Sequence, residues 1–190
     1  MIQELFPVAL YREELNLNTT AIAKYCLDMK SVVPGVQLSN VGGWQSPKLT
    51  GQHEPLDTLF ISISKAAQHY RDTIQYEHPL KINTLWVNIN REKDYNLEHN
   101  HPNSVVSGVY YVKAQKKDGD LVLAHPASLL MAYDWHESDV KEFNKYNSAV
   151  WIIPPIENRL LLFPSWLRHS VKPNLNKDED RISISFNLTR

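Results

Sequence analysis

The sequence predicts an α+β fold that is mainly β, a jelly roll with N-terminal helices packed on one face. Two observations predict it. Helical periodicity is confined to the first 80 residues, and from Lys81 onward short runs of β-branched and aromatic residues are separated by turn residues. At 190 residues the chain suits one domain. We therefore expect a single domain over 1–190, with a helical part at 1–80 and a β core at 81–190.

Two segments of the first part carry helix signals. Asn18 can cap a helix that runs to about Lys30, and Pro55 precedes a second helix. The first would bury Ile22, Cys26 and Met29 on one face. The second carries a stripe at close to a 3.6-residue repeat, made of Leu56, Leu59, Phe60, Ile63, Ala67, Tyr70 and Ile74. Both apolar helix faces need a sheet to pack against.

The β half contains six candidate strands. They lie within 81–90, 104–114, 119–126, 148–155, 159–167 and 181–189. Between Pro126 and Asn147 a long segment interrupts them, too long for a hairpin loop. This segment is either a binding loop at the rim or a surface excursion with one short helix.

Composition argues against several classes of partner. Twenty basic and twenty-one acidic residues leave a net charge of −1, without the basic patch expected for duplex nucleic acid. The start lacks a signal-peptide pattern, and no run approaches the roughly 20 apolar residues of a membrane helix. A lone cysteine, Cys26, reads as a buried helix thiol. We expect a cytoplasmic protein, in the host cytoplasm if viral, whose oligomeric state the sequence does not determine.

A pair of histidines stands out among the eight. His99 and His101 are two residues apart, so on an extended chain both side chains point to one side and can bind one metal ion. A facial metal site needs a third ligand, and His169, 68 residues after His101 on a later β run, is the candidate. Structural histidines or a zinc site explain the same spacing. For His53, His69 and His78 a surface or hydrogen-bonded role is expected.

A basic residue lies twelve positions after His169, and a residue with a hydroxyl group follows two positions later. Arg181 and Ser183 are two apart on the last strand, face the same way and can together bind a carboxylate. The alternative for Arg181 is a surface ion pair with the neighbouring acidic residues 178–180.

Four motifs together resemble the Fe(II)- and 2-oxoglutarate-dependent oxygenases, in particular a branch found in marine bacteria and phages. They are GGWQS at 42–46, HNHPNSVVSGVYYV at 99–112, LFPSWLRHSV at 162–171 and RISISFN at 181–187. The resemblance runs over nearly the whole chain. It implies a double-stranded β-helix core, iron held by an H-x-D/E pair plus a distant histidine, and 2-oxoglutarate anchored by a basic residue on the closing strand.

The resemblance also assigns roles to individual residues. His99 matches the first metal ligand and His169 the last, whereas His101 stands where the superfamily places an acidic ligand. Arg181 would pair with the distal carboxylate of 2-oxoglutarate, with Ser183 adding a hydrogen bond.

Three further positions bear on the resemblance. Asn88 matches a position where some members place an amide against the co-substrate, although a strand amide satisfied by the backbone is the alternative. Glu98 should point to the opposite side of its strand from His99. Asn158 stands where a glycine is expected in a turn, and asparagine tolerates the left-handed conformation.

The implied activity is a dioxygenase that uses Fe(II), 2-oxoglutarate and O2 to hydroxylate a small-molecule or peptide substrate, with release of succinate and CO2. Two alternatives remain: a three-histidine iron oxygenase that does not use 2-oxoglutarate, and a non-catalytic jelly-roll module with structural or zinc-binding histidines. Candidates for lining a substrate pocket are Trp44, Tyr110, His125, Trp135, His136 and Trp151.

Overall fold

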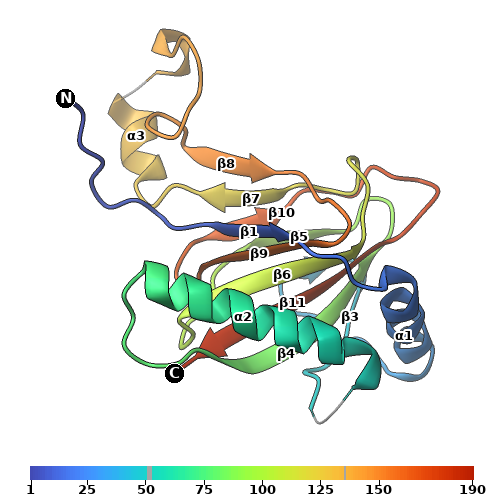
Figure 1. Cartoon of the computed structure of the whole chain (residues 1–190). Helices are drawn as coiled ribbons and strands as arrows, with labels where there is room; N and C mark the ends of the chain where they lie inside the picture. Colours follow the sequence, from blue (N-terminus) through green and yellow to red (C-terminus); the bar gives the residue numbers. More distant parts are fainter. Residues whose placement is uncertain (51–52, 135) are drawn as a thin grey trace.

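Two antiparallel sheets face each other in the computed structural model, which describes residues 1–50, 53–134 and 136–190. The major sheet has the strand order β1-β9-β6-β11-β4-β3, and the minor sheet has the order β2-β5-β10-β7-β8 (Figure 1). The predicted mainly β jelly-roll architecture is confirmed.

The chain passes back and forth between the two sheets, so each sheet contains strands from distant parts of the sequence. The strands of the major sheet are β1 (Tyr11–Glu14), β3 (Trp44–Gln45), β4 (Lys81–Asn90), β6 (Val106–Lys113), β9 (Arg159–Pro164) and β11 (Arg181–Thr189). Those of the minor sheet are β2 (Asn40–Val41), β5 (Tyr95–His99), β7 (Leu121–Ala124), β8 (Val150–Ile153) and β10 (His169–Val171).

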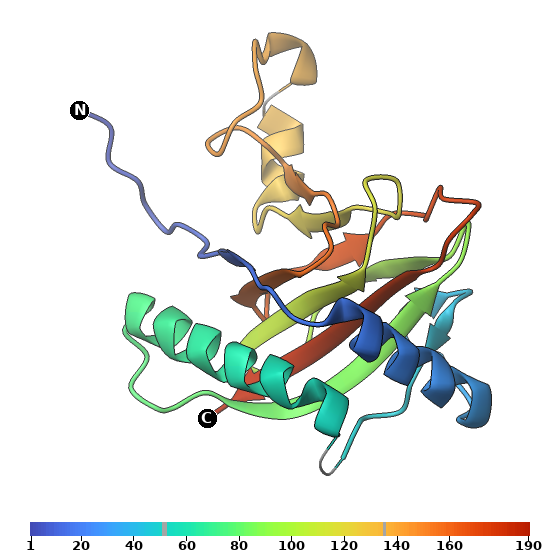
Figure 2. The same cartoon turned by 45° about the vertical axis from the view of Figure 1, so that its right-hand side comes forward.

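The two predicted helices are present and cover the outer side of the major sheet (Figures 1 and 2). Helix α1 (Thr19–Val32) is capped by Asn18, whose side chain accepts a hydrogen bond from the amide of Ala21 at 3.1 Å. Helix α2 (Asp57–Thr73) follows a 3-10 turn at Glu54–Leu56. Its stripe is buried as predicted except at Phe60, which is half-buried, and at Ile74, which lies beyond the helix and is exposed.

Two apolar layers hold the molecule together. One lies between the helices and the major sheet and receives alternate residues of β4 and β11, such as Val87 and Ile184. The other is smaller, lies between the two sheets and includes Leu121 and Phe163. Because the smaller layer fills only part of the space between the sheets, room remains there for a cavity.

The first 80 residues are less purely helical than predicted, because they also contribute β1, β2 and β3. These strands gave no signal: β1 reads YREE at a sheet edge, and the other two have two residues each. Strand β5 was also missed, because it is short and mostly polar. His169, expected on a β run, begins the short separate strand β10. Pattern recognition depends on longer apolar alternation than these segments offer.

The segment between Pro126 and Asn147 carries the short helix α3 (Ser128–Asp134) and a 3-10 turn at Glu137–Asp139, and it projects from the sheets (Figure 2). Asn158 adopts the left-handed conformation (φ 64°), and its side chain accepts hydrogen bonds from the Leu17 amide and the Tyr110 hydroxyl. Among the described residues, no helix has the length and apolar character needed to span a membrane.

Candidate active site

A cavity of about 1050 Å³ opens between the two sheets. Its wall on the major sheet comes from alternation: Asn88 of β4 and Ser183 and Ser185 of β11 face the cavity, while the residues between them enter the apolar layer under the helices. The minor sheet contributes histidines. The cavity therefore has a polar strand wall on one side and metal-binding side chains on the other.

The three predicted histidines converge at this cavity. His99 ends β5, His169 begins β10, and the two are direct partners in the minor sheet. His101 follows β5, and its amide donates to the carbonyl of Ser165 at 3.0 Å, which ties it to the connection between β9 and β10. The candidate ligand atoms of the three side chains all lie within 4.8 Å of one another. The structure thus brings the three histidines together at one place.

Hydrogen bonds fix the orientation of two of the rings. Nδ1 of His99 lies 2.7 Å from the carbonyl oxygen of Leu97, and Nδ1 of His169 lies 2.8 Å from that of Leu167. A carbonyl can only accept, so Nδ1 carries the proton in both rings and Nε2 presents its lone pair. The ring of His101 packs against the indole of Trp86, with 5.6 Å between ring centroids.

Burial keeps these imidazoles uncharged. It lowers the pKa of His169 to about 3 and that of His101 to about 4, and neighbouring histidines lower both pKa values further. The pKa of His99 is also lowered by burial. Neutral imidazole is the form that binds metal, so near neutral pH the cluster is ready for an ion without first losing protons.

The donor set fits a divalent metal such as iron. A metal–nitrogen bond is about 2.1 Å long, so two ligands of one ion are at most about 4.2 Å apart, and small side-chain rotations close the set. Three imidazole ligands leave other coordination positions open toward the cavity. Glu98 is paired with Arg168 and is not part of the cluster, as its strand position predicted.

Arg181 lies at one end of the polar wall and is buried, with 3% of its surface exposed. Its Nη1 donates to the carbonyls of Asp118 and Gly119, both at 3.1 Å, and its Nη2 donates to Oδ1 of Asn90 at 2.8 Å. The surface ion-pair interpretation is therefore wrong. Instead, the nearby acidic residues pair with lysines: Glu179 with Lys113, and Asp180 with Lys30.

One edge of this guanidinium remains available. Nε of Arg181 is buried and has no hydrogen-bond partner among the described residues. Three of the five N–H groups are used, which leaves the Nε hydrogen and one on Nη2. A carboxylate would satisfy both and would also balance a buried positive charge.

Two other predicted residues line the cavity beside Arg181. Ser183 pairs in register with Asn88 of β4 on one side and with Tyr111 of β6 on the other. The amide of Asn88 donates to the hydroxyl of Ser185 at 3.1 Å, so its partner is a side chain across the strands rather than the backbone. Burial raises the pKa of Tyr111 to about 12, so its phenol stays protonated and can donate a hydrogen bond.

The aromatic candidates are not brought to the cavity. Tyr110 lies in the apolar layer under the helices, Trp44 donates to the carbonyl of Val33, and Trp151 is exposed on β8. His125 is exposed, His136 lines a separate hollow of about 520 Å³ in the 126–147 segment, and Trp135 lies outside the described residues.

Several residues that line the cavity were missed in the sequence. They are Thr84, Trp86, Ser107, Tyr111, Ser185 and Asn187. Asn90, which contacts Arg181 directly, was missed as well. A signal was present, because TLWVNIN at 84–90 and RISISFNLT at 181–189 each place a polar or large aromatic residue at every second position. That alternation predicts a strand with one polar face.

Solved structures share this fold at low sequence identity. A prolyl-4-hydroxylase from Pseudomonas putida superposes with a TM-score of 0.66 and 13% identity, covering 95% of this chain and 92% of that one. A collagen prolyl hydroxylase of Paramecium bursaria chlorella virus 1, solved with 2-oxoglutarate, gives a TM-score of 0.60 and 13% identity, covering 94% of both chains. HygX from Streptomyces hygroscopicus, with nickel and 2-oxoglutarate bound, gives 0.64 and 10%, covering 96% and 83%.

No curated protein matches the chain by sequence. The family model described as "Putative 2OG-Fe(II) oxygenase" matches residues 84–187, which is more than half of the chain and contains all three histidines and Arg181. The chain therefore belongs to this family of 2-oxoglutarate- and Fe(II)-dependent oxygenases.

Proposed function

We propose that the protein is a non-haem dioxygenase that hydroxylates its substrate with conversion of 2-oxoglutarate to succinate and CO2. One observation carries the proposal. A cluster of three neutral histidines and one buried arginine with an unsatisfied edge lie along the same cavity. The first can bind a divalent metal, and the second can bind a carboxylate.

Each candidate residue then has a physical role. His99, His101 and His169 would hold the iron, with three neutral ligands in place of the usual two histidines and one carboxylate. Arg181 would bind the distal carboxylate of 2-oxoglutarate through its Nε edge. Ser183 would add a hydrogen bond, and Asn88, fixed by Ser185, would present its amide oxygen to the co-substrate side of the wall.

When bound, iron and 2-oxoglutarate supply the oxidation: one oxygen atom of O2 enters a C–H bond of the substrate, and the other enters succinate as CO2 leaves. The protein orients the reactants and limits the access of water. The strand wall is suited to this task because β11 lies between β4 and β6, so its side chains are held by neighbours on both sides.

The test is an anaerobic titration of 2-oxoglutarate into the Fe(II)-loaded protein. A metal-to-ligand charge-transfer band should appear, and admission of O2 should yield succinate and CO2 in equal amounts. His169→Ala should abolish the band, while the matched control His78→Ala, at an exposed position, should retain it.

Two results would contradict the proposal. Tightly bound zinc with four closed ligands would favour the non-catalytic module. Stable Fe(II) binding without any spectral or calorimetric response to 2-oxoglutarate would instead favour a three-histidine oxygenase that chelates its substrate directly.

A further inference from the structure

The polar wall of the cavity is graded in charge along its length. Strand register arranges the facing residues of β4 and β11 in rows: Asn90 with Arg181, Asn88 with Ser183, Trp86 with Ser185, and Thr84 with Asn187. A formal charge occurs only in the first row. Two other charged residues line the cavity. Lys48 is exposed, and Glu98 is paired with Arg168.

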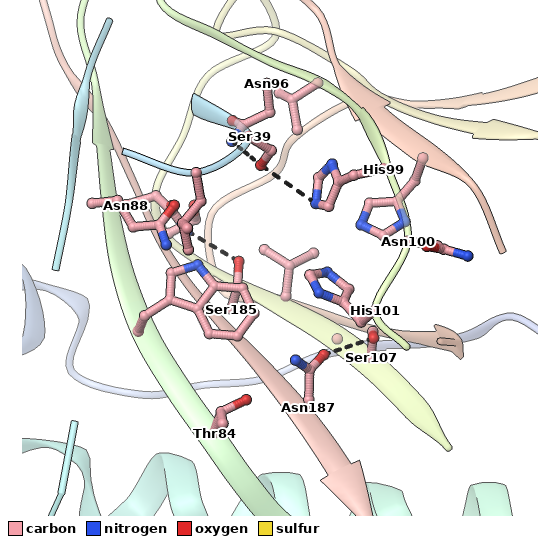
Figure 3. Close-up of a pocket in the computed structure, with 18 of the residues that line it drawn as sticks. Ser39, Thr84, Asn88, Asn96, His99, Asn100, His101, Ser107, Ser185 and Asn187 are labelled. Atoms are coloured by element: carbon pink, nitrogen blue, oxygen red, sulfur yellow. Dashed lines mark hydrogen bonds between the residues drawn. The ribbon is translucent and has the colours of Figure 1, made fainter. Parts of the chain in front are cut away.

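The wall is too long for one small dicarboxylate. Asn187 lies six positions after Arg181, and at about 3.3 Å per residue the distance between them along the strand is about 20 Å. The histidine cluster lies between the two ends, because His101 packs against Trp86 in the third row. By strand register, the end at Thr84 and Asn187 therefore lies beyond the cluster from Arg181 and is free for a second molecule. In Figure 3, Thr84 and Asn187 lie below His99 and His101.

Hydrogen bonds fix the polar groups at that far end. The hydroxyl of Ser107 contacts that of Ser165 at 2.8 Å and donates to Oδ1 of Asn187 at 2.7 Å. With Oδ1 occupied, the free end of the Asn187 amide is Nδ2, a donor that makes no hydrogen bond within the described part of the chain. The hydroxyl of Thr84, in the same row, is shielded from solvent and has no partner among the described residues.

We propose that the prime substrate binds at the row formed by Thr84, Asn187 and Ser107 through an uncharged group with hydrogen-bond donors and acceptors, a carboxamide or a hydroxyl. The inference rests on the proposed function. Asn187 offers a donor, and the Thr84 hydroxyl can donate or accept. None of these three side chains carries a charge, and Lys48, which also lines the cavity, is exposed to solvent. The row therefore offers a charged group neutral hydrogen bonds in place of its hydration, which favours an uncharged group.

Two matched pairs of probes test the charge rule. N-acetylglycinamide is compared with N-acetylglycine, and glucose with glucose 6-phosphate, on the protein loaded with Co(II) and 2-oxoglutarate. Paramagnetic relaxation of the probe protons by Co(II) is measured by NMR. We expect at least about threefold stronger relaxation for the uncharged member of one pair than for its charged partner; the pair that responds distinguishes amide from hydroxyl recognition.

Thr84→Val links the effect to this row. Valine has nearly the shape of threonine, and the lost hydroxyl has no partner in the described part of the chain, so the variant should fold normally and relax the uncharged probe at least about threefold less. Thr58→Val, exposed on α2, is the matched control and should behave as wild type.

The inference is overturned if the charged members relax equally or more strongly, if no uncharged member responds, or if Thr84→Val matches wild type. Relaxation of the 2-oxoglutarate protons is measured in the same sample. Its absence would show that the proposed function itself fails, whereas its presence with a negative probe result rejects only the substrate inference.

Discussion

The two faces of β11 have different roles, although the residues of both faces alternate along one strand. Ile182, Ile184 and Phe186 point into the apolar layer under the helices and are fully buried. The alternate residues face the cavity; they are Arg181, Ser183, Ser185 and Asn187. The comparison teaches that stability and ligand binding are separated by one residue step, so substitutions on one face should affect one property and spare the other.

Phe186→Ala should give the largest effect, on the apolar face. The ring is fully buried and lies against Gly108, where an added Cβ would come within 2.3 Å of it. Removing it should leave a cavity and lower the free energy of unfolding by about 3–5 kcal/mol, measured by urea denaturation. The folded fraction should bind 2-oxoglutarate as wild type does. Phe143→Ala, at an exposed position, is the control; loss of 2-oxoglutarate affinity without loss of stability would contradict the separation of faces.

Arg181→Met should give the largest effect on the polar face. A hydrogen-bonded charge contributes about 1.5–3 kcal/mol, so the Kd for 2-oxoglutarate should rise about 10- to 150-fold in anaerobic calorimetry of the Co(II) protein. Metal affinity should hold, because Arg181 does not touch the histidines. The exposed Arg12→Met serves as the comparison, and an unchanged Kd in Arg181→Met would remove arginine from the co-substrate site.

Ser183→Ala should have a smaller effect in the same assay. A neutral hydrogen bond is worth about 0.5–1.5 kcal/mol, which corresponds to about a two- to tenfold rise in the Kd for 2-oxoglutarate. Urea stability should stay near wild type. Ser64→Ala on the exposed side of α2 provides the matched change. A loss of stability comparable to that of Phe186→Ala would show that this face is structural.

The smallest effect concerns Cys26, on the helix side of the major sheet. Burial raises the pKa of its thiol to about 12, so the reactive thiolate is scarce at pH 8 and becomes abundant only as the pH approaches 12. The native protein should therefore react negligibly with a thiol reagent at pH 8, and the urea-unfolded protein should react at once. Fast native labelling would mean that α1 opens readily.

The features that depend on neighbouring residues could be predicted from the sequence. The helices and the longer strands followed from periodicity, and the shared orientation of His99 and His101 followed from their spacing of two residues. The polar alternation of β4 and β11 was equally readable. These features depend on neighbours along the chain, which is why they could be predicted.

The remainder depends on contacts between distant segments. Nothing near Arg181 in the sequence indicates that Asn90, Asp118 and Gly119 surround its guanidinium, and the acidic residues beside it suggested the wrong partners. The pairing of His99 with His169 depends on two strands too short to show a pattern. Burial of a charge and short-strand register are properties of the assembled sheets.

The turn before β7 has a consequence for how this chain can vary through evolution. Gly119 has a φ of 91°, and a Cβ there would lie 2.2 Å from the carbonyl oxygen of Lys172, next to the guanidinium of Arg181. Insertions or larger residues at 118–119 should therefore be selected against in descendants of this gene, whereas the projecting 126–147 segment can change in length and composition. Lineages are expected to diversify at the projecting segment and to keep the turn constant.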